Sequence, residues 1–109
     1  MTGDGREHFA FSAELWRWPG GEGSGAWHFV RLDGETGEAI SALALMRRLE
    51  GGQRRGWGSL KVEAQIGESR WPTSIFPEKG GTWLLPVKKS VRSAESLSAG
   101  DLARVEIAL

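Results

Sequence analysis

The chain has 109 residues, of which 39% are hydrophobic and 26% charged, and its formal net charge at pH 7 is zero. This length fits one domain, and the composition is ordinary for a soluble globular protein. The absence of cysteine excludes disulfides, thiolate chemistry and cysteine-based zinc sites. No apolar run approaches the roughly 18 residues of a membrane helix, and the polar N-terminus lacks the apolar core of a signal peptide. We therefore expect a cytoplasmic protein.

The charge is unevenly distributed along the chain. Residues 1–46 carry three basic and seven acidic side chains, a net charge of −4, whereas residues 47–109 carry eleven and seven, a net charge of +4. A neutral chain is poorly suited to duplex binding, which depends largely on neutralised phosphates, but a local basic patch suffices for a small anion. The basic side chains form two groups, which are Arg47, Arg48, Arg54, Arg55 and Lys61, and then Lys88, Lys89 and Arg92.

In chain order, a tail over residues 1–7 precedes a first strand over residues 8–18. Alternation of apolar and polar residues with a period of two predicts this strand. Trp16 and Trp18 lie on its more polar face, so they are either covered by a helix or partly exposed. The opposite face carries Phe9, Phe11, Ala13 and Leu15.

A glycine-rich loop over residues 19–25 leads to a second strand over residues 26–32. Asp33 then suits the N-cap of a helix, because its carboxylate accepts orphan backbone N–H groups. The glycine pair at residues 51–52 ends this helix. Gly37 weakens it locally by about 1 kcal/mol relative to alanine.

The second half of the chain reads as four further strands and a short helix. Strands are predicted over residues 60–66, 70–76 and 82–87, and a last strand ends at Leu109. Pro72 disfavours a fully paired central position within its strand. The short helix is predicted over residues 88–95.

Short strands joined by frequent glycine turns favour a barrel or sandwich, and a closed barrel leaves no exposed strand edges. We therefore predict a mainly β fold, a small six-stranded β-barrel with one longer helix and one short helix. Residues 8–109 form this single domain, behind a disordered N-terminal tail over residues 1–7.

Several segments in the chain together resemble a known bacterial family. They are Leu15-Trp16-Arg17-Trp18, Trp71-Pro72-Thr73-Ser74-Ile75-Phe76-Pro77, Leu85-Pro86-Val87-Lys88, Arg92 and Gly100-Asp101. In order and spacing they resemble the family called domain of unknown function 1905 (DUF1905), over roughly residues 8–109. The resemblance implies a small β-barrel and no established activity. The family pattern usually has arginine between the tryptophan and the Thr-Ser pair, where this chain has Pro72.

The Gly100-Asp101 turn is similar to turns in other small barrels, including swapped-hairpin transcription factors of the AbrB type. In those barrels the aspartate ties down the turn. We therefore interpret Asp101 as an Asx-turn acceptor that locks the start of the last strand. The same analogy supplies one alternative function, nucleic-acid binding, although likeness of fold is a weak warrant for function.

Six tryptophans and no tyrosine is an unusual composition for a chain of this length. Such rings stack on bases, sugars or peptides, or they fill a small barrel and its ends. We interpret Trp27, Trp57 and Trp83 as mainly structural and place Trp71 in the core. Trp16 and Trp18 are the candidates for a binding surface.

Thr73 and Ser74 are the candidates for a nucleophile, which needs a base within hydrogen-bond reach. No motif links them to His8 or His28, the only two histidines. The histidines and Glu14 are also the candidates for a metal site, but their spacing matches no metal motif. A small enzyme using Thr73 or Ser74 is therefore an alternative hypothesis.

Lys88, Lys89 and Arg92 surround the start of the predicted short helix, where backbone N–H groups add to their attraction for an anion. The alternative is solvated charge with pairing to Glu95. We predict a non-catalytic binding or interaction module that needs no cofactor. Its partner is a small anionic ligand or another protein, rather than nucleic acid or a membrane. The candidate contact residues are Trp16, Trp18, Lys88, Lys89 and Arg92.

Overall fold

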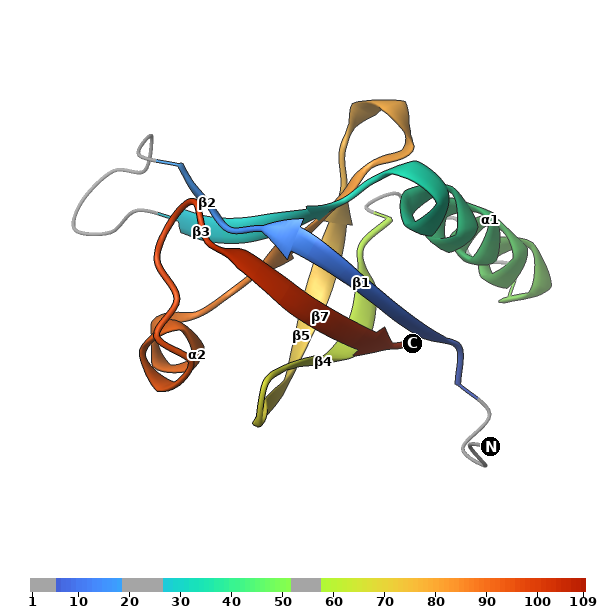
Figure 1. The fold of residues 1–109 in the computed structure, drawn as a ribbon. Coiled ribbons are helices and arrows are strands. Elements are labelled where there is room, and N and C mark those ends of the chain that lie inside the picture. Colours follow the sequence, from blue (N-terminus) through green and yellow to red (C-terminus); the bar gives the residue numbers. More distant parts are fainter. Residues whose placement is uncertain (1–5, 19–26, 52–57) are drawn as a thin grey trace.

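Seven strands form a single antiparallel sheet, accompanied by one long and one short helix (Figure 1). The computed structural model describes residues 6–18, 27–51 and 58–109. The strands are β1 His8–Glu14, β2 Trp16–Trp18, β3 Trp27–Leu32, β4 Leu60–Ile66, β5 Ser69–Pro77, β6 Trp83–Pro86 and β7 Leu102–Ala108. The helices are α1 Gly34–Gly51, α2 Lys89–Ala94 and the 3-10 turn η1 Lys79–Gly81. Outside the described residues lie most of the expected tail, the loop over residues 19–25, Arg54, Arg55 and Trp57.

The strand order in the sheet is β1-β7-β4-β5-β6-β3-β2. Its two outermost strands, β1 and β2, are consecutive in the chain and are separated only by the buried Leu15. Because one residue joins the two ends of the sheet, the sheet cannot lie flat and curls into a half-barrel. Contacts between β1 and β3 accompany this curl.

The predicted mainly β fold with one longer and one short helix is confirmed. The first strand differs, because it is divided at Leu15, and the sheet therefore has seven strands instead of six. The Leu15 N–H donates to the carbonyl oxygen of Asp101 (2.9 Å), and the Leu15 carbonyl accepts from the Gly100 N–H (2.7 Å). At this residue the backbone bonds to the turn before β7, and the chain then continues as β2 beside β3.

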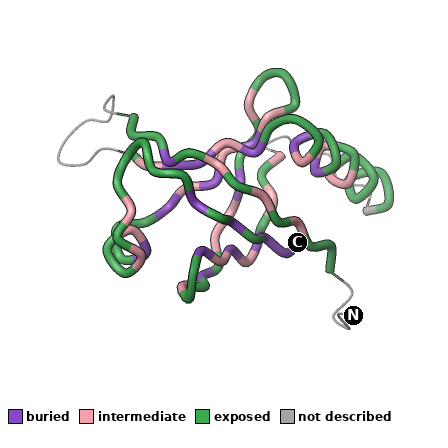
Figure 2. Tube along the Cα trace, viewed as in Figure 1, coloured by how far each residue is buried: buried purple, intermediate pink, exposed green. Residues whose placement is uncertain are grey.

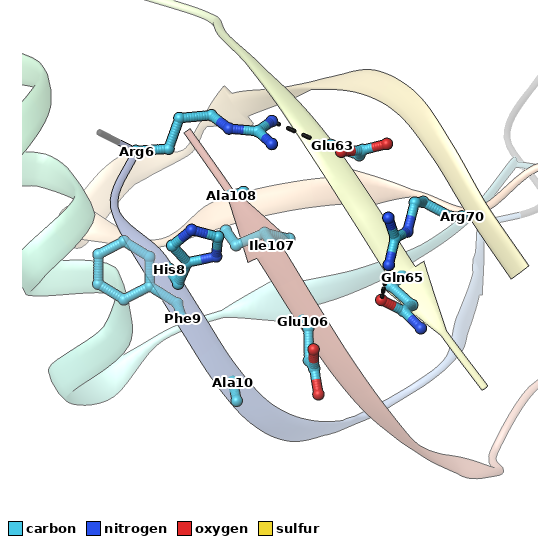
Figure 3. Close-up of a pocket in the computed structure, with 10 residues that line it drawn as sticks. All are labelled: Arg6, His8, Phe9, Ala10, Glu63, Gln65, Arg70, Glu106, Ile107 and Ala108. Carbon is cyan, nitrogen blue, oxygen red and sulfur yellow. Dashed lines mark hydrogen bonds and ion pairs between the residues drawn. The ribbon is translucent and has the colours of Figure 1, made fainter. Parts of the chain in front are cut away.

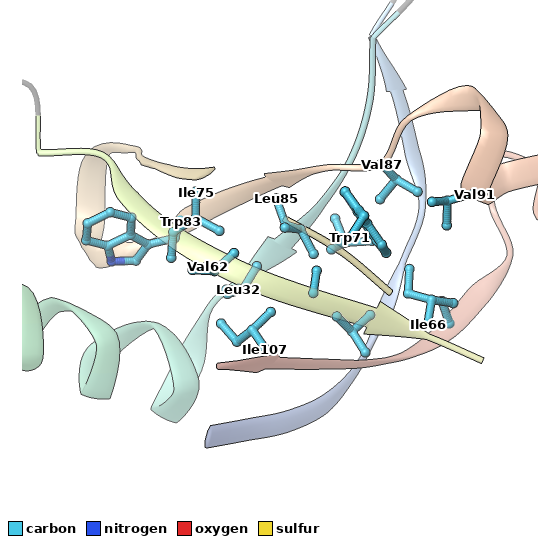
Figure 4. Packing of buried hydrophobic residues seen from close by; sticks show 14 of the residues in the cluster. Leu32, Val62, Ile66, Trp71, Ile75, Trp83, Leu85, Val87, Val91 and Ile107 are labelled. Carbon is cyan, nitrogen blue, oxygen red and sulfur yellow. The ribbon is translucent and has the colours of Figure 1, made fainter. Parts of the chain in front are cut away.

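The hydrophobic core fills the space between the curled strands (Figure 4). Val62, Ala64 and Ile66 of β4 are buried at every second position, as the alternation in the sequence predicts. Trp71 and Trp83, each 4% exposed, are the two tryptophans of the cluster, which confirms their predicted structural role. The cluster is completed by Leu15, Val30, Leu32, Ile40, Ile75, Leu85, Val87, Val91, Ala103, Val105, Ile107 and Leu109.

Pro72 lies at a point where β5 has a partner on one side only. It pairs with Glu63 of β4, whereas β6 pairs with β5 only through Phe76 and Pro77. Proline has no N–H to donate, so a strand tolerates it best where one edge is open. The expectation that Pro72 avoids a fully paired position is confirmed.

The helix α1 begins after Asp33 and ends at Gly51, as predicted, but it packs on the sheet only near its start. Ile40 is fully buried there, and Trp83 donates its indole N–H to the hydroxyl of Ser41 (2.9 Å). From Leu45 to Glu50 every side chain is exposed, and Figure 2 shows these outer turns of the helix in green.

Gly37 stands where the helix approaches the rest of the backbone most closely. A Cβ atom at this position would lie 2.6 Å from the carbonyl oxygen of Leu32 and 2.7 Å from that of Gly81. Real Cβ atoms do not approach other heavy atoms so closely, and backbone atoms cannot move aside as a side chain can. The residue that weakens the isolated helix is therefore the one that lets α1 dock.

We predict that Gly37→Ala lowers the free energy of unfolding, although alanine favours an isolated helix by about 1 kcal/mol. Overpacking a tight contact costs about 1–3 kcal/mol and outweighs that gain. Urea denaturation monitored by circular dichroism measures the change. Arg47→Ala, at an exposed position of the same helix, is the control and should shift stability by less than about 0.5 kcal/mol. A Gly37→Ala protein as stable as the wild type would contradict the close contact.

Candidate binding surface

Four aromatic side chains gather on the outer face of β2 and β3. The register of these strands places Trp16 opposite Phe29 and Trp18 opposite Trp27. Directly opposed residues in an antiparallel pair point to the same face, so the four rings form two adjacent cross-strand pairs. We call these four residues the aromatic patch. Its tryptophans are 43%, 57% and 56% exposed for Trp16, Trp18 and Trp27, while Phe29 lies beneath at 8%.

The position of the aromatic patch follows from the phase of β3. Val30 and Leu32 point inward and are buried, so Trp27 and Phe29 must point outward. The interpretation of Trp27 as a structural, core-filling residue is therefore wrong. Its phase opposite to Val30 and Leu32 was the signal in the sequence that could have placed it. The open question about Trp16 and Trp18 is answered, because both are exposed.

Arg31 continues the outward phase of β3 and borders the aromatic patch. Its guanidinium carbon lies 4.5 Å from the centre of the Trp16 ring and 5.9 Å from that of Phe29. Its Nε atom also lies 3.4 Å from a carboxylate oxygen of Glu78. Cation–π contacts at exposed sites contribute about 0.5–1 kcal/mol. Arg31 therefore orients the Trp16 ring, and its charge is already shared with Glu78.

The outer surface remains apolar beyond the aromatic patch. Pro86 of β6 pairs with Phe29, and Leu84 of β6 pairs with both Arg31 and Phe76 of β5. Phe76 is 43% exposed, and Leu84 and Pro86 are half-buried. The patch is thus one end of a longer apolar surface that crosses four strands.

The basic residues around α2 have a more local role than the tryptophans. The Nε–H of Arg92, which is half-buried, donates to the carbonyl oxygen of Val87 (3.1 Å). Lys88 and Lys89 are exposed at the start of this helix. Arg92 thereby stabilises the junction between β6 and α2, and anion binding by the three residues stays a prediction.

Glu95, the expected partner of this basic group, makes a different contact. Its carboxylate accepts a hydrogen bond from the hydroxyl of Ser69 (2.7 Å). The same carboxylate lies over Gly67, the first residue of the turn between β4 and β5. Glu95 therefore ties α2 to the β4–β5 hairpin.

A hollow of about 430 Å³ lies on the outer face of β1, β7, β4 and β5 (Figure 3). The small side chains of Ala10 and Ala108 leave the space, and charged groups surround it. Arg6 reaches Glu63 across it, with 3.5 Å between nitrogen and oxygen, and other lining contacts include a 3.1 Å hydrogen bond from Arg70 to Gln65. Small-molecule pockets are mostly apolar with a few polar groups. Polar and apolar side chains line this hollow in nearly equal measure, so it matches this description poorly.

Thr73 and Ser74 of β5 are half-buried opposite Val62 and Lys61 of β4. Neither residue lines the hollow of Figure 3. Within residues 6–18, 27–51 and 58–109, neither hydroxyl is hydrogen-bonded to a histidine or a carboxylate. The pairing of nucleophile and base that hydrolytic catalysis needs is therefore not formed by these residues in this structure.

His8 and His28 lie on opposite faces of the sheet. His8 is on the outer face of β1, beside the hollow, while His28 shares the inward phase of Val30 on β3. Among the residues that the structure describes, no three His, Cys, Asp or Glu side chains are grouped to hold a metal ion. In the same part of the chain, no helix is long and apolar enough to span a membrane.

Asp101 fixes the turn that receives Leu15. Its carboxylate accepts a hydrogen bond from the Ser98 N–H (2.8 Å), and its own N–H donates to the Ser98 carbonyl (2.9 Å). Gly100 adopts a φ of +97°, which favours glycine. The predicted turn-locking role of Asp101 is confirmed, but the predicted Asx turn is not, because the carboxylate accepts from Ser98, three residues earlier in the chain.

Comparison with known families identifies the chain. The family model described as domain of unknown function (DUF1905) matches residues 11–107, nearly the whole sequence. The chain belongs to the DUF1905 family. The match spans the aromatic patch and the Gly100-Asp101 turn, and it confirms the resemblance noted from the sequence. Among curated proteins, none matches this DUF1905 domain.

We predict that Asp101→Ala lowers the free energy of unfolding by about 1 kcal/mol, as loss of a side-chain cap on a backbone N–H usually does. Asp101→Asn, which keeps an acceptor oxygen, should recover at least half of that loss. Thermal and urea denaturation of both variants measure the effect. Equal stability for wild type and Asp101→Ala would show that the turn forms without the carboxylate.

Proposed function

We propose that this DUF1905 domain is a non-catalytic module that binds an apolar segment of another protein through the aromatic patch. The observation that carries the proposal is the clustering of three tryptophans, each 43–57% exposed, in two neighbouring cross-strand residue pairs of β2 and β3. Single exposed apolar residues are ordinary, whereas contiguous apolar patches mark interaction sites. Tryptophan is also among the residues that most often dominate the energy of protein interfaces.

The polar groups beside the aromatic patch favour a protein over a sugar or a nucleic acid. A sugar that stacks on rings also needs hydrogen-bonding side chains to bind its hydroxyl groups, and a nucleic acid needs available positive charge. Arg31 is the charged group in contact with the patch rings among the described residues, and it is already engaged with Trp16 and Glu78. An apolar peptide needs neither of these groups.

A proline-rich segment is the simplest peptide of this kind. It adopts an extended helix with little loss of entropy on binding, and proteins recognise it with grooves lined by aromatic rings. Two rings on β2 and two on β3, continued by Pro86 and Leu84, supply rings and apolar surface along one direction.

We predict that a proline-rich decapeptide shifts the indole N–H resonances of Trp16, Trp18 and Trp27 in an NMR titration. The resonances of the buried Trp71 and Trp83 should stay in place. Trp18→Ala should raise the dissociation constant at least about tenfold, as loss of a central aromatic contact does. Met46→Ala, which truncates an exposed apolar side chain on α1, away from this surface, is the control and should bind nearly as well as the wild type.

Two other probes test whether the aromatic patch binds a different class of ligand. A hexasaccharide or a single-stranded oligonucleotide that shifts the same indole signals would replace the protein partner with a different class of ligand. Peptide-induced shifts confined to the region of Lys88, Lys89 and Arg92 would move the binding surface away from the tryptophans.

A further inference from the structure

The outer half of α1 carries large apolar side chains that do not belong to the hydrophobic core of the chain. Leu45, Met46 and Leu49 are 53%, 54% and 71% exposed. Most helices in proteins are stabilised by packing of an apolar face rather than by intrinsic propensity. The last turns of α1 have such a face, but its side chains are exposed, and this end of the helix projects from the sheet (Figure 1).

The exposed stripe has the spacing of a helix–helix contact. It consists of Glu35, Glu38, Ala42, Leu45 and Leu49, which follow one another at steps of three and four residues and are all exposed. This is the repeat of positions a and d in a two-stranded coiled coil. We call these five residues the α1 stripe.

The α1 stripe points directly away from the body of the domain. In this repeat the buried Ile40 takes position f, which lies on the opposite side of the helix from positions a and d. The buried Gly37 and the half-buried Ala44 both take position c, on the same side as Ile40. The contact that docks α1 on the sheet therefore leaves the stripe free along its whole length.

Charge along α1 identifies the partner that suits the stripe. The stripe is acidic at its start, with Glu35 and Glu38, and apolar at its end, where Arg48 flanks Leu49. A second α1 running in the opposite direction brings Arg48 close to Glu38 of the other copy. It also sets the small Ala42 against the larger Leu45, the alternation that lets two helices approach closely.

A membrane surface fits the same stripe less well. An interfacial helix inserts its whole apolar face, and biological membranes are commonly anionic. Here two glutamates lie in line with the leucines, and an anionic surface would repel them. The antiparallel arrangement instead supplies each glutamate end with an arginine.

We infer that the domain forms a two-fold symmetric homodimer in which α1 pairs antiparallel with α1 of a second copy along the α1 stripe. In such an interface each contact occurs twice, once from each copy. This surface is separate from the aromatic patch, so Trp18→Ala leaves the dimer intact, and the two proposals stand or fall separately.

Sedimentation equilibrium of the full chain over about a hundredfold range of concentration tests the dimer. The wild type should show a concentration-dependent dimer. The double variant Leu45→Glu, Leu49→Glu should raise the dimer dissociation constant at least about tenfold, while its circular dichroism remains that of the wild type. At concentrations where both proteins are monomeric, the two should also share one melting temperature. Leu102→Glu is the matched control, because Leu102 is 72% exposed but lies on β7, outside the stripe.

The orientation of the helices has its own test, since the chain contains no cysteine. An equimolar mixture of Ala42→Cys and Leu45→Cys chains should oxidise mainly to the mixed disulfide, because antiparallel pairing sets these positions opposite each other. Arg48→Glu should weaken the dimer, and adding Glu38→Arg to the same chain should restore it.

Several results would overturn the inference. A wild-type chain that stays monomeric over the whole range excludes the dimer, and so does Leu102→Glu dissociating it as strongly as the stripe variant. Preference for like-with-like disulfides at position 42 indicates parallel helices. Cosedimentation of a monomeric wild type with phosphatidylserine vesicles, lost in the stripe variant, assigns the stripe to a membrane.

Discussion

The two hydrogen bonds between Leu15 and the Gly100-Asp101 turn determine the shape of this domain. They join the ends of a seven-stranded sheet through a single residue, because β1 and β2 lie at opposite edges and yet adjoin in the chain. An open sheet of this size would expose its apolar face to water. Curling encloses that face, and the buried Leu15 side chain becomes part of the core it closes. The carboxylate of Asp101 is important because it holds the turn that accepts this strand.

Enclosure of the core also decides which tryptophans are available for binding. The interior of the half-barrel takes Trp71 and Trp83, one of which needs a hydrogen bond to Ser41 for its indole N–H. The inward positions of β3 belong to Val30 and Leu32, so Trp27 is outside together with Trp16 and Trp18. Exposure of these rings is thus a consequence of strand phase. Arg31 covers part of the Trp16 ring, and Glu78 pairs with that arginine.

The long helix likewise has one part that packs on the domain and one part that is exposed. Close approach at Gly37 and burial of Ile40 fix its first turns, whereas every side chain from Leu45 to Glu50 is exposed. The aromatic patch and the α1 stripe lie on different elements and have different chemistry, one of flat rings and one of glutamate, alanine and leucine side chains. The proposals of peptide binding and of dimerisation therefore rest on separate surfaces of this DUF1905 domain.

The sequence alone determined the local elements, because strand alternation, helix caps and glycine turns depend on neighbours in the chain. It placed the strand over residues 60–66, the end of α1 at Gly51 and the turn-locking role of Asp101, and its motifs indicated the family. Tertiary structure decided what depends on distant partners. Leu15 divides the first strand only because the turn before β7 bonds to it, and Trp16 lies opposite Phe29 only because β2 pairs with β3 in this register. Gly37 is essential only because the carbonyl groups of Leu32 and Gly81 lie against it. These contacts join residues that are far apart in the sequence, so the patterns of neighbouring residues could not predict them.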